Sequence, residues 1–504
     1  MPERVDIVII GAGPCGLGAA SRLTQQGKDN WLLVDGAEEA GGLACTDVTP
    51  EGFLFDMGGH VIFSHYDYFD QLLDTAVGTG PEHWSVHERV SYVWMMKRWV
   101  PYPFQNNICS LPLEDQISCI NGLIEAKVAN AMATDKPENF DQWILRVMGA
   151  GIADIFMRPY NFKVWAIPTE LMQCTWLGER VATANVSKVI ENVLRNKEES
   201  GWGPNAVFRF PQEGGTGGIW KKVSQRLIPA ERQRYGEGGR VVGLDAAARV
   251  LTMADGTEIQ YNKLMSTMPL DNTLRWLGKG EWADELTYSS SHIIGIGVRG
   301  VNPHDTKCWL YYPEDDCPFY RCTVFSHYAD KNVPAATVQL RTLRTAQDPA
   351  AGKDGAEAGP YWSLMFEVSE SGHKPVDINQ VVEVRPSPCV YKLSDTIRGA
   401  INTCLVSPGD EIVSVYHRRL EHGYPTPCLK RDGAIAKALP WLKDEHNIWS
   451  RGRFGSWKYE VGNQDHSCML GVECVDNMLH GAKEFTLWHP SLVRQKKSSE
   501  LSSS

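Results

Sequence analysis

The first 35 residues constrain the fold more than any other part of the chain, because they place a glycine-rich turn between two apolar runs. The runs span residues 5–10 and 31–34, the turn is GAGPCG at residues 11–16, and Asp35 follows the second run. This order is typical of the strand, turn, helix and second strand that bind a dinucleotide. We therefore predict an α/β chain that begins with a Rossmann-like domain.

Each glycine of the turn has its own physical role. Gly11 permits the tight turn, Gly13 lets the backbone approach a pyrophosphate, and Gly16 lets the helix pack closely on the strand. The N-terminus of the helix then faces the phosphates. Asp35 lies 19 residues after Gly16, where an acidic side chain binds a ribose hydroxyl. An ordinary glycine turn is the alternative, but the strand, the helix and the acid together favour a dinucleotide site.

Further glycines indicate that the dinucleotide is FAD. Two glycine pairs, Gly41-Gly42 and Gly58-Gly59, follow the second strand, and such pairs let the backbone run close to a long extended cofactor. Near the other end of the chain, a polar stretch at 462–467 precedes an apolar helical run. The positive N-terminus of that helix would stabilise negative charge on a reduced flavin. The predicted cofactor-binding residues are Gly11, Gly13, Pro14, Cys15, Gly16, Asp35, Gly41, Gly42, Leu43, Gly58, Gly59, His60, Val241, Gly462, Asn463, Gln464 and Ser467.

The residues between these two cofactor-binding regions must be inserted into the nucleotide-binding domain. Helical spacing of apolar side chains begins at Phe140, with Asn139 and Gln142 as a cap pair. Strand patterns recur after residue 291, and in one of these strands alternating side chains form one buried face. That face consists of Trp362, Leu364, Phe366 and Val368.

We predict a Rossmann-like FAD-binding domain with an inserted helical domain and an antiparallel β-sheet domain. A hairpin across Asp255-Gly256 and its returning strand would complete the adenine side of the FAD fold. Small polar residues predict a loop at 344–360 and a disordered tail at 493–504. The expected boundaries are 1–88, 206–290 and 424–492 for the FAD-binding domain, 110–205 for the helical domain, and 89–109 with 291–423 for the substrate-binding sheet domain.

Composition limits the classes of ligand. The chain has 50 basic and 61 acidic residues, a net charge of −11, so we expect no attraction to nucleic acid or membranes, and an anionic ligand would need a local cationic pocket. No apolar run approaches the roughly 20 residues of a membrane span, and a first strand at Val5 leaves no room for a signal peptide. We therefore expect a cytoplasmic protein. The 13 cysteines include no CxxC pair, which favours reduced thiols and predicts no metal site.

The inserted segments are rich in polar aromatic residues and isolated arginines. Trp and Tyr stack on rings, while Arg and the Tyr hydroxyl bind phosphate oxygens, so this combination suits a sugar nucleotide. Taken singly, however, an aromatic residue is more often part of the core than of a ligand site, and an arginine is more often part of a surface ion pair.

Several longer motifs are more specific. GAGPCGLGAA, GGLACTD, GFLFDMGGHVIFSHY, WVPYPFQNN, RPYNFKVWA, WLGER, GGTGGIW, CWLYYPEDDCPFYR, HGYPTP and GRFGSWKYEVGNQDHSCMLGVE occur between residue 7 and about residue 475. Together they resemble the eukaryotic, fungal-type UDP-galactopyranose mutase family. Members of that family interconvert UDP-galactopyranose and UDP-galactofuranose on reduced FAD, and Cys45 and Cys468 differ from the residues we would expect at those positions.

The resemblance implies roles for individual residues. Arg180 and Arg321 should flank the diphosphate, and His60 should lie near the N5–O4 edge of the flavin. These three residues are the predicted catalytic residues. The alternative for His60 is a buried structural role. Hydroxyl groups that assist at the diphosphate should come from Tyr311, Tyr328, Tyr424 and Tyr459. The uridine should lie among Tyr102, Phe104, Gln105, Phe156, Asn161 and Trp165. The sugar should lie near Asn205, Trp309 and Arg453.

The resemblance also implies a mechanism and a cellular role. Reduced flavin N5 attacks the anomeric carbon, UDP leaves, and the covalent flavin–sugar adduct opens and recloses as the five-membered ring without net redox change. Fungal members are reduced by NADPH, so we expect that reductant here. We also expect that the protein forms a homo-oligomer and that it supplies galactofuranose for cell-surface glycans. The alternatives are an amine-oxidase-like or desaturase-like oxidoreductase and a non-catalytic FAD-dependent scaffold. An oxidoreductase of that type would require an apolar or amine-binding channel instead of paired arginines.

Overall fold

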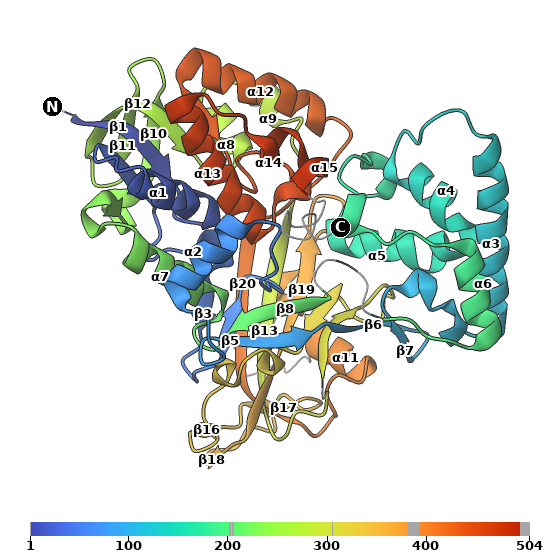
Figure 1. The fold of residues 1–504 in the computed structure, drawn as a ribbon. Helices are drawn as coiled ribbons and strands as arrows, with labels where there is room; N and C mark the ends of the chain where they lie inside the picture. Colours follow the sequence, from blue (N-terminus) through green and yellow to red (C-terminus); the bar gives the residue numbers. More distant parts are fainter. Residues whose placement is uncertain (1, 201–202, 204–205, 305, 382–393, 494–504) are drawn as a thin grey trace.

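The computed structural model describes residues 2–200, 203, 206–304, 306–381 and 394–493. Figure 1 shows an α/β region built from both ends of the chain, a group of helices on one side of the molecule, and a large sheet beneath the α/β region. The predicted fold class is therefore confirmed. Asn205 and the predicted tail from 494 onward lie outside the described residues.

The α/β region contains the predicted dinucleotide-binding unit. β1 (Glu3–Ile10) leads through the glycine turn into α1 (Pro14–Gln25) and then into β2 (Trp31–Val34), which pairs with β1 in parallel. The predicted hairpin is formed by β11 (Val250–Met253) and β12 (Glu258–Ser266), and β12 returns parallel to β1. The sheet order is β10-β11-β12-β1-β2-β9, with β21 beside β12. The other strands are β9 (Gln233–Arg234), β10 (Val241–Asp245) and β21 (Ile448–Ser450).

Helices from distant parts of the sequence cover this sheet. α13 (Gln464–His480) packs against α1, which brings the C-terminal polar stretch to the N-terminal glycine turn. The prediction of a second helix N-terminus at the polar stretch 462–467 is thus confirmed, and the helix begins after Asn463. The remaining helices of this region are α2 (Asp67–Val77), α7 (Gly215–Leu227), α8 (Leu270–Trp276), α9 (Gly280–Ala283), α12 (Arg431–His446), α14 (Phe485–Trp488) and α15 (Pro490–Val493).

The large sheet has eight strands in the order β17-β20-β13-β19-β15-β14-β6-β7. Neighbouring strands are antiparallel except β14 and β6, which are parallel. The strands are β6 (Val90–Met95), β7 (Arg98–Pro101), β13 (Tyr288–Arg299), β14 (Lys307–Tyr311), β15 (Arg321–Thr323), β17 (Arg344–Thr345), β19 (Tyr361–Glu370) and β20 (Glu411–Pro425).

One sequence prediction is confirmed here and one needs correction. The predicted buried face of β19, which contains Trp362 and Phe366, packs in the core, and the opposite face, with Met365 and Glu367, is buried as well. The predicted loop at 344–360 contains two short strands, β17 and β18 (Ala356–Ala358), which pair with β20 and β16 (Gln339–Arg341). Such short pairings depend on backbone hydrogen bonds and leave no apolar pattern in the sequence.

Other short strands and helices are β3 (Thr46–Val48), β4 (Leu54–Asp56), β5 (Trp84–Glu88), β8 (Val207–Pro211), α10 (Ile378–Val381) and α11 (Asp395–Asn402).

The helical group consists of α3 (Leu113–Met132), α4 (Phe140–Ile152), α5 (Arg158–Trp165) and α6 (Val186–Arg195). The cap predicted for α4 is confirmed, because Gln142 donates its backbone N–H to Asn139 Oδ1 at 2.9 Å. Among the helices of the described residues, none combines the length and the apolar composition that crossing a bilayer requires.

Candidate active site

One cavity of about 640 Å³ extends from the N-terminal glycine turn to the large sheet and the helical group. Its walls come from the β1–α1 turn, the segment after β4, strands β14, β15, β19 and β20, and the N-terminus of α13. Predicted residues that line it include Gly11, Gly13, Pro14, Cys15, Asp35, Gly42, Leu43, Gly58, Gly59, His60, Tyr102, Arg180, Trp309, Tyr311, Arg321, Tyr424, Arg453, Tyr459, Gly462, Asn463, Gln464 and Ser467. The fold thus brings most predicted residues from all parts of the sequence to one place.

The glycine turns form a narrow cradle at one end of the cavity. Gly11 has a φ of +101°, and a Cβ atom there would lie 1.9 Å from Thr267 Oγ1. A Cβ atom on Gly42 would lie 2.9 Å from the Cα atom of Gly13. The two turns therefore meet backbone to backbone. The N-cap residue of α1, Gly13, has no side-chain cap, so the helix N-terminus stays open to an anionic ligand.

Asp35 stands at the end of β2 beside this cradle. Its Oδ2 accepts the N–H of Ala12 at 2.6 Å, and its Oδ1 accepts the N–H of Ala37 at 2.7 Å. Burial raises the pKa of Asp35, and the two N–H groups offset part of that rise. Each carboxylate oxygen can accept more than one hydrogen bond, so Asp35 can also bind a hydroxyl in the cavity.

His60 lies on the wall next to the Gly58-Gly59 turn. Its Nδ1 is buried and has no hydrogen-bond partner among the described residues. Burial lowers the pKa of His60 to about 4; Glu367 opposes this shift, while the charges of Arg453 and Arg321 add to it. His60 is therefore neutral at neutral pH and can offer one N–H donor and one acceptor to a ligand.

A second helix N-terminus also lines the cavity, at the start of α13. Asn463 is the N-cap residue of α13, and it makes no side-chain cap to its own helix. Instead, Asn463 Oδ1 accepts from Arg180, whose Nη1 and Nη2 lie 3.3 and 3.2 Å away. The backbone N–H groups at the start of α13 can therefore bind negative charge on a ligand.

Three predicted arginines surround the middle of the cavity, and their partners differ. Arg180 also donates to the Glu460 carbonyl at 3.1 Å and lies 4.5 Å from the centre of the Tyr459 ring. Arg453 donates to two backbone carbonyls, those of Gly462 and Gly423, each at 3.2 Å. Neither has a carboxylate partner among the described residues. Arg321 does, because its Nε and Nη2 bind the two oxygens of Glu367 at 2.7 and 2.8 Å.

Aromatic side chains complete this wall. Arg453 lies 4.9 Å from the ring centre of Tyr424 and 5.6 Å from that of Tyr459. Tyr102 and Tyr311 contact each other, with their ring centres 5.0 Å apart. Trp309 Nε1 is buried without a partner among the described residues. These rings and open donors suit a flat polar ligand with negative charge.

Other predicted ligand residues lie behind the cavity wall. Phe104 stacks on Phe156 with ring centres 4.4 Å apart, Asn161 donates to the Met157 carbonyl, and Gln105 donates to the Ala182 carbonyl. Trp165 contacts Tyr459, whose ring centre lies 4.7 Å away. The remaining predicted residues outside the cavity lining are Gly16, Gly41, Val241 and Tyr328.

Sequence reasoning did not single out Arg89 or Glu367, which are among the charged residues that line the cavity. Arg89 lies 5.3 Å from the ring centre of Tyr102, just before β6. Glu367 is a charged residue within the apolar strand β19, and this was the one signal that could have identified it.

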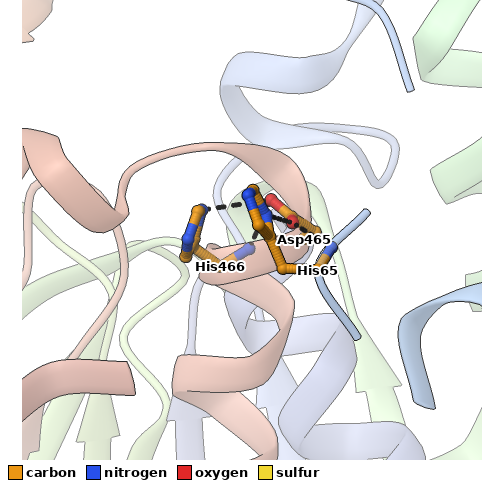
Figure 2. A group of neighbouring side chains, drawn as sticks. All are labelled: His65, Asp465 and His466. Carbon is orange, nitrogen blue, oxygen red and sulfur yellow. Dashed lines mark hydrogen bonds and ion pairs between the residues drawn. The ribbon is translucent and has the colours of Figure 1, made fainter. Parts of the chain in front are cut away.

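Three further side chains meet beside the N-terminus of α13, as Figure 2 shows. Asp465 Oδ2 accepts from the backbone N–H and the Nδ1 of His65 at 3.1 and 2.7 Å, and Asp465 Oδ1 accepts the backbone N–H of His466 at 2.8 Å. Burial alone would raise the pKa of Asp465, but His466 and His65 outweigh it and hold that pKa far below its usual value. Two imidazoles and a carboxylate could bind a metal ion, but a helix N-terminus disfavours a cation and both carboxylate oxygens already accept hydrogen bonds. We therefore assign this group the structural role of joining the segment after His60 to α13.

Comparison with known proteins agrees with this geometry. Residues 9–76 match the sequence family described as an NAD(P)-binding Rossmann-like domain. The whole chain is similar to a reduced UDP-galactopyranose mutase, with 44% identity, 98% of each chain covered and a TM-score of 0.87. A protein named as a protoporphyrinogen oxidase from Exiguobacterium is 13% identical, with 95% of this chain and 99% of that chain covered and a TM-score of 0.63. Putrescine oxidase with bound putrescine is 11% identical, with 95% and 100% covered and a TM-score of 0.56. These last two similarities show the shared fold alone.

Proposed function

The chain belongs to the UDP-galactopyranose mutase family, and on this premise we propose that it is an FAD-dependent isomerase that interconverts UDP-galactopyranose and UDP-galactofuranose in the cavity described above. The observation that supports this most directly is the group of three arginines in one cavity of a chain with a net charge of −11. Two of them lack a described carboxylate partner, so they give this cavity the positive potential that a diphosphate requires.

The described residues fit FAD. The cavity has two helix N-termini without side-chain caps, a cradle of glycines where a Cβ atom would clash, and Asp35 at the end of β2. These are the features that bind a pyrophosphate, hold an extended dinucleotide and accept from a ribose. When bound in its reduced form, FAD supplies the nucleophile for the anomeric carbon of the sugar.

The protein's own residues orient the substrate and stabilise its charge. Arg180, Arg321 and Arg453 would bind the diphosphate and neutralise the charge that develops when UDP separates from the sugar. Tyr311, Tyr424 and Tyr459 would contribute hydroxyl donors and flat surfaces, and Trp309 would lie near the sugar. The neutral His60 would donate or accept one hydrogen bond at the cofactor without adding a positive charge there. We propose that Phe104, Gln105, Phe156, Asn161, Trp165 and Tyr328 support these residues from behind.

We extend the proposal to the cellular role. NADPH would reduce the cofactor, the enzyme would act in the cytoplasm, and its product would supply galactofuranose to cell-surface glycans. An amine-oxidase-like oxidoreductase is the alternative, since putrescine oxidase shares the fold. The arginines of the cavity disfavour it, because they would repel a cationic amine.

We also propose that the chain forms homo-oligomers through the outer face of α3. Apolar side chains at helical spacing are exposed along this face: Leu113, Ile117, Ile124, Val128 and Met132. A second copy in antiparallel orientation would cover this stripe and would place the acidic first turn of one α3, with Glu114 and Asp115, near Lys127 of the other. Val128→Glu should then lower the mass measured by light scattering to that of a smaller species. Leu194→Glu on α6, also exposed, is the matched control and should leave the mass unchanged.

The central test is turnover of UDP-galactofuranose by dithionite-reduced protein without an electron acceptor. The oxidised protein should be inactive, and one reduction should support many turnovers, because the isomerisation has no net redox change. Consumption of one NADPH for each product formed would refute the isomerase and favour the oxidoreductase. Binding of FAD without any turnover would favour the scaffold.

A further inference from the structure

The buried carboxylate of Glu367 lies in the wall between the proposed diphosphate site and the turn that contains His60. Its side chain is 2% exposed. Glu367 on β19 is directly opposite Arg321 on β15 in the antiparallel register, so the two side chains meet across the strands. Burial alone would raise the pKa of Glu367, but Arg321, Tyr320 and the Gly59 N–H outweigh it and hold that pKa below its usual value. Glu367 is therefore an anion at neutral pH.

The ion pair determines what Arg321 can offer to a ligand. Glu367 Oε1 accepts from Nε of Arg321, and Oε2 accepts from its Nη2. This bidentate contact fixes the plane of the guanidinium and leaves Nη1 without a hydrogen bond to any described residue. Because Arg321 lines the cavity, Nη1 is the donor that remains for a diphosphate oxygen. The pair as a whole is neutral, in contrast to Arg180 and Arg453.

The same carboxylate also holds two other parts of the wall. Its Oε1 accepts the N–H of Gly59 at 3.0 Å, and its Oε2 accepts the hydroxyl of Tyr320 at 2.6 Å. Gly59 immediately precedes His60. One oxygen atom of Glu367 thus joins Arg321 to the turn that positions His60.

An anion in this place opposes the binding of a diphosphate, because like charges repel strongly in a partly desolvated site. Glu367 therefore does not increase the affinity of the site for UDP. Binding energy that is equal in the ground state and the transition state does not raise kcat, whereas an arginine held in one orientation can act selectively on the transition state.

We propose that Glu367 is a positioning residue that reduces the affinity for UDP but holds Arg321 and the His60 turn in the orientation needed for turnover. This proposal rests on the proposed function, since it places the diphosphate of the substrate at Arg321. It predicts that removal of the negative charge tightens binding of UDP and slows the reaction. A merely structural residue would weaken both.

Glu367→Gln is the direct test, because glutamine keeps an oxygen for Gly59 and Arg321 but loses the charge. In FAD-loaded protein, titration calorimetry should show UDP binding about tenfold tighter than in the wild type, and the reduced enzyme should show kcat at least about tenfold lower. The melting temperature without ligand should fall, and UDP should raise it more than in the wild type, since the ligand replaces the lost counter-ion of Arg321. Tyr320→Phe removes one hydrogen bond from Glu367 without a change of charge, so its dissociation constant for UDP should stay within about twofold of the wild type.

Unchanged or weaker UDP binding by Glu367→Gln would overturn the proposal. If that variant does not fold, Glu367→Asp decides, since it keeps the charge but cannot reach both Arg321 and Gly59. Its affinity for UDP should remain near the wild-type value while kcat falls at least about tenfold, and a wild-type kcat would overturn the proposal. Failure of the wild-type protein itself to bind UDP would refute the proposed function instead.

Discussion

Arg180 and Arg321 line the same cavity, but their replacement should have different consequences. The hydrogen-bond partners of Arg180 among the described residues are neutral, so Arg180→Ala removes a cation and leaves none of them as an unpaired buried charge. The loss of one charge-assisted contact with the diphosphate is about 1.5–3 kcal/mol, or roughly ten- to more than a hundredfold in affinity. The free energy of unfolding should change little. Arg321→Ala instead leaves Glu367 buried and unpaired, which should lower stability by about 3–5 kcal/mol in addition to its effect on the substrate.

The assay combines three measurements on each variant: the dissociation constant of UDP, kcat/KM for UDP-galactofuranose with reduced enzyme, and the melting temperature. Flavin absorbance per protein should stay near the wild-type value in Arg180→Ala, because the glycine turns and Asp35 hold the cofactor. Lysine at position 180 should restore only part of the loss, since it lacks the planar fork. Arg146→Ala, which breaks a surface ion pair with Asp135, is the control and should leave UDP affinity, turnover and melting temperature near their wild-type values. Equal losses of stability in Arg180→Ala and Arg321→Ala, or wild-type UDP affinity in Arg180→Ala, would refute this reasoning.

Three further outcomes follow from the structure. Gly11→Ala should abolish flavin binding, because a φ of +101° and a contact of 1.9 Å with Thr267 leave no space for a methyl group; normal flavin absorbance would contradict this. Arg453→Lys should weaken UDP binding by about tenfold, since lysine loses the planar contact with the tyrosine rings, and an unchanged dissociation constant would contradict the assignment. The melting temperature should fall as the pH is lowered from 6.5 toward 4. The folded protein keeps His60 neutral to about pH 4, whereas the unfolded chain takes up that proton near its ordinary pKa of about 6.5. The stability due to this difference, at most about 3 kcal/mol, is present above pH 6.5 and is lost across that window. If the melting temperature of His60→Gln falls as steeply with decreasing pH as that of the wild type, groups other than His60 cause the effect.

The parts of the site that sequence reasoning predicted are those that depend on local patterns. The turn after β1 and the start of α13 each combine special residues with a flanking apolar run, so their structure follows from neighbours in the chain. Composition cannot distinguish a ring that lines the cavity from one that packs behind it. Phe104 and Tyr102 lie close together in the sequence, yet only Tyr102 is among the residues that line the cavity.

Glu367 was not predicted because its role depends on the register between distant strands. Its partner Arg321 is 46 residues away in the sequence, and a shift of one residue in the pairing would place Glu367 on the other face of the sheet. The prediction for this strand rested on the alternation of Trp362, Leu364, Phe366 and Val368, and that pattern gives no role to the residues between them. In the structure the opposite face is also buried, and Glu367 on that face lines the cavity.

The electrostatics of the site likewise depend on partners that the sequence does not reveal. Counting arginines in the motifs gives Arg180, Arg321 and Arg453 equal weight as anion-binding residues. In the structure, the charge of Arg321 is balanced by Glu367. The hydrogen bonds of Arg453 to described residues go to carbonyl oxygens alone, and burial together with the nearby charge of Arg180 lowers the pKa of Arg453. Two uncompensated cations held near each other are costly in the absence of an anion. An arriving diphosphate relieves that repulsion, so the chain can be acidic overall and still bind an acidic substrate.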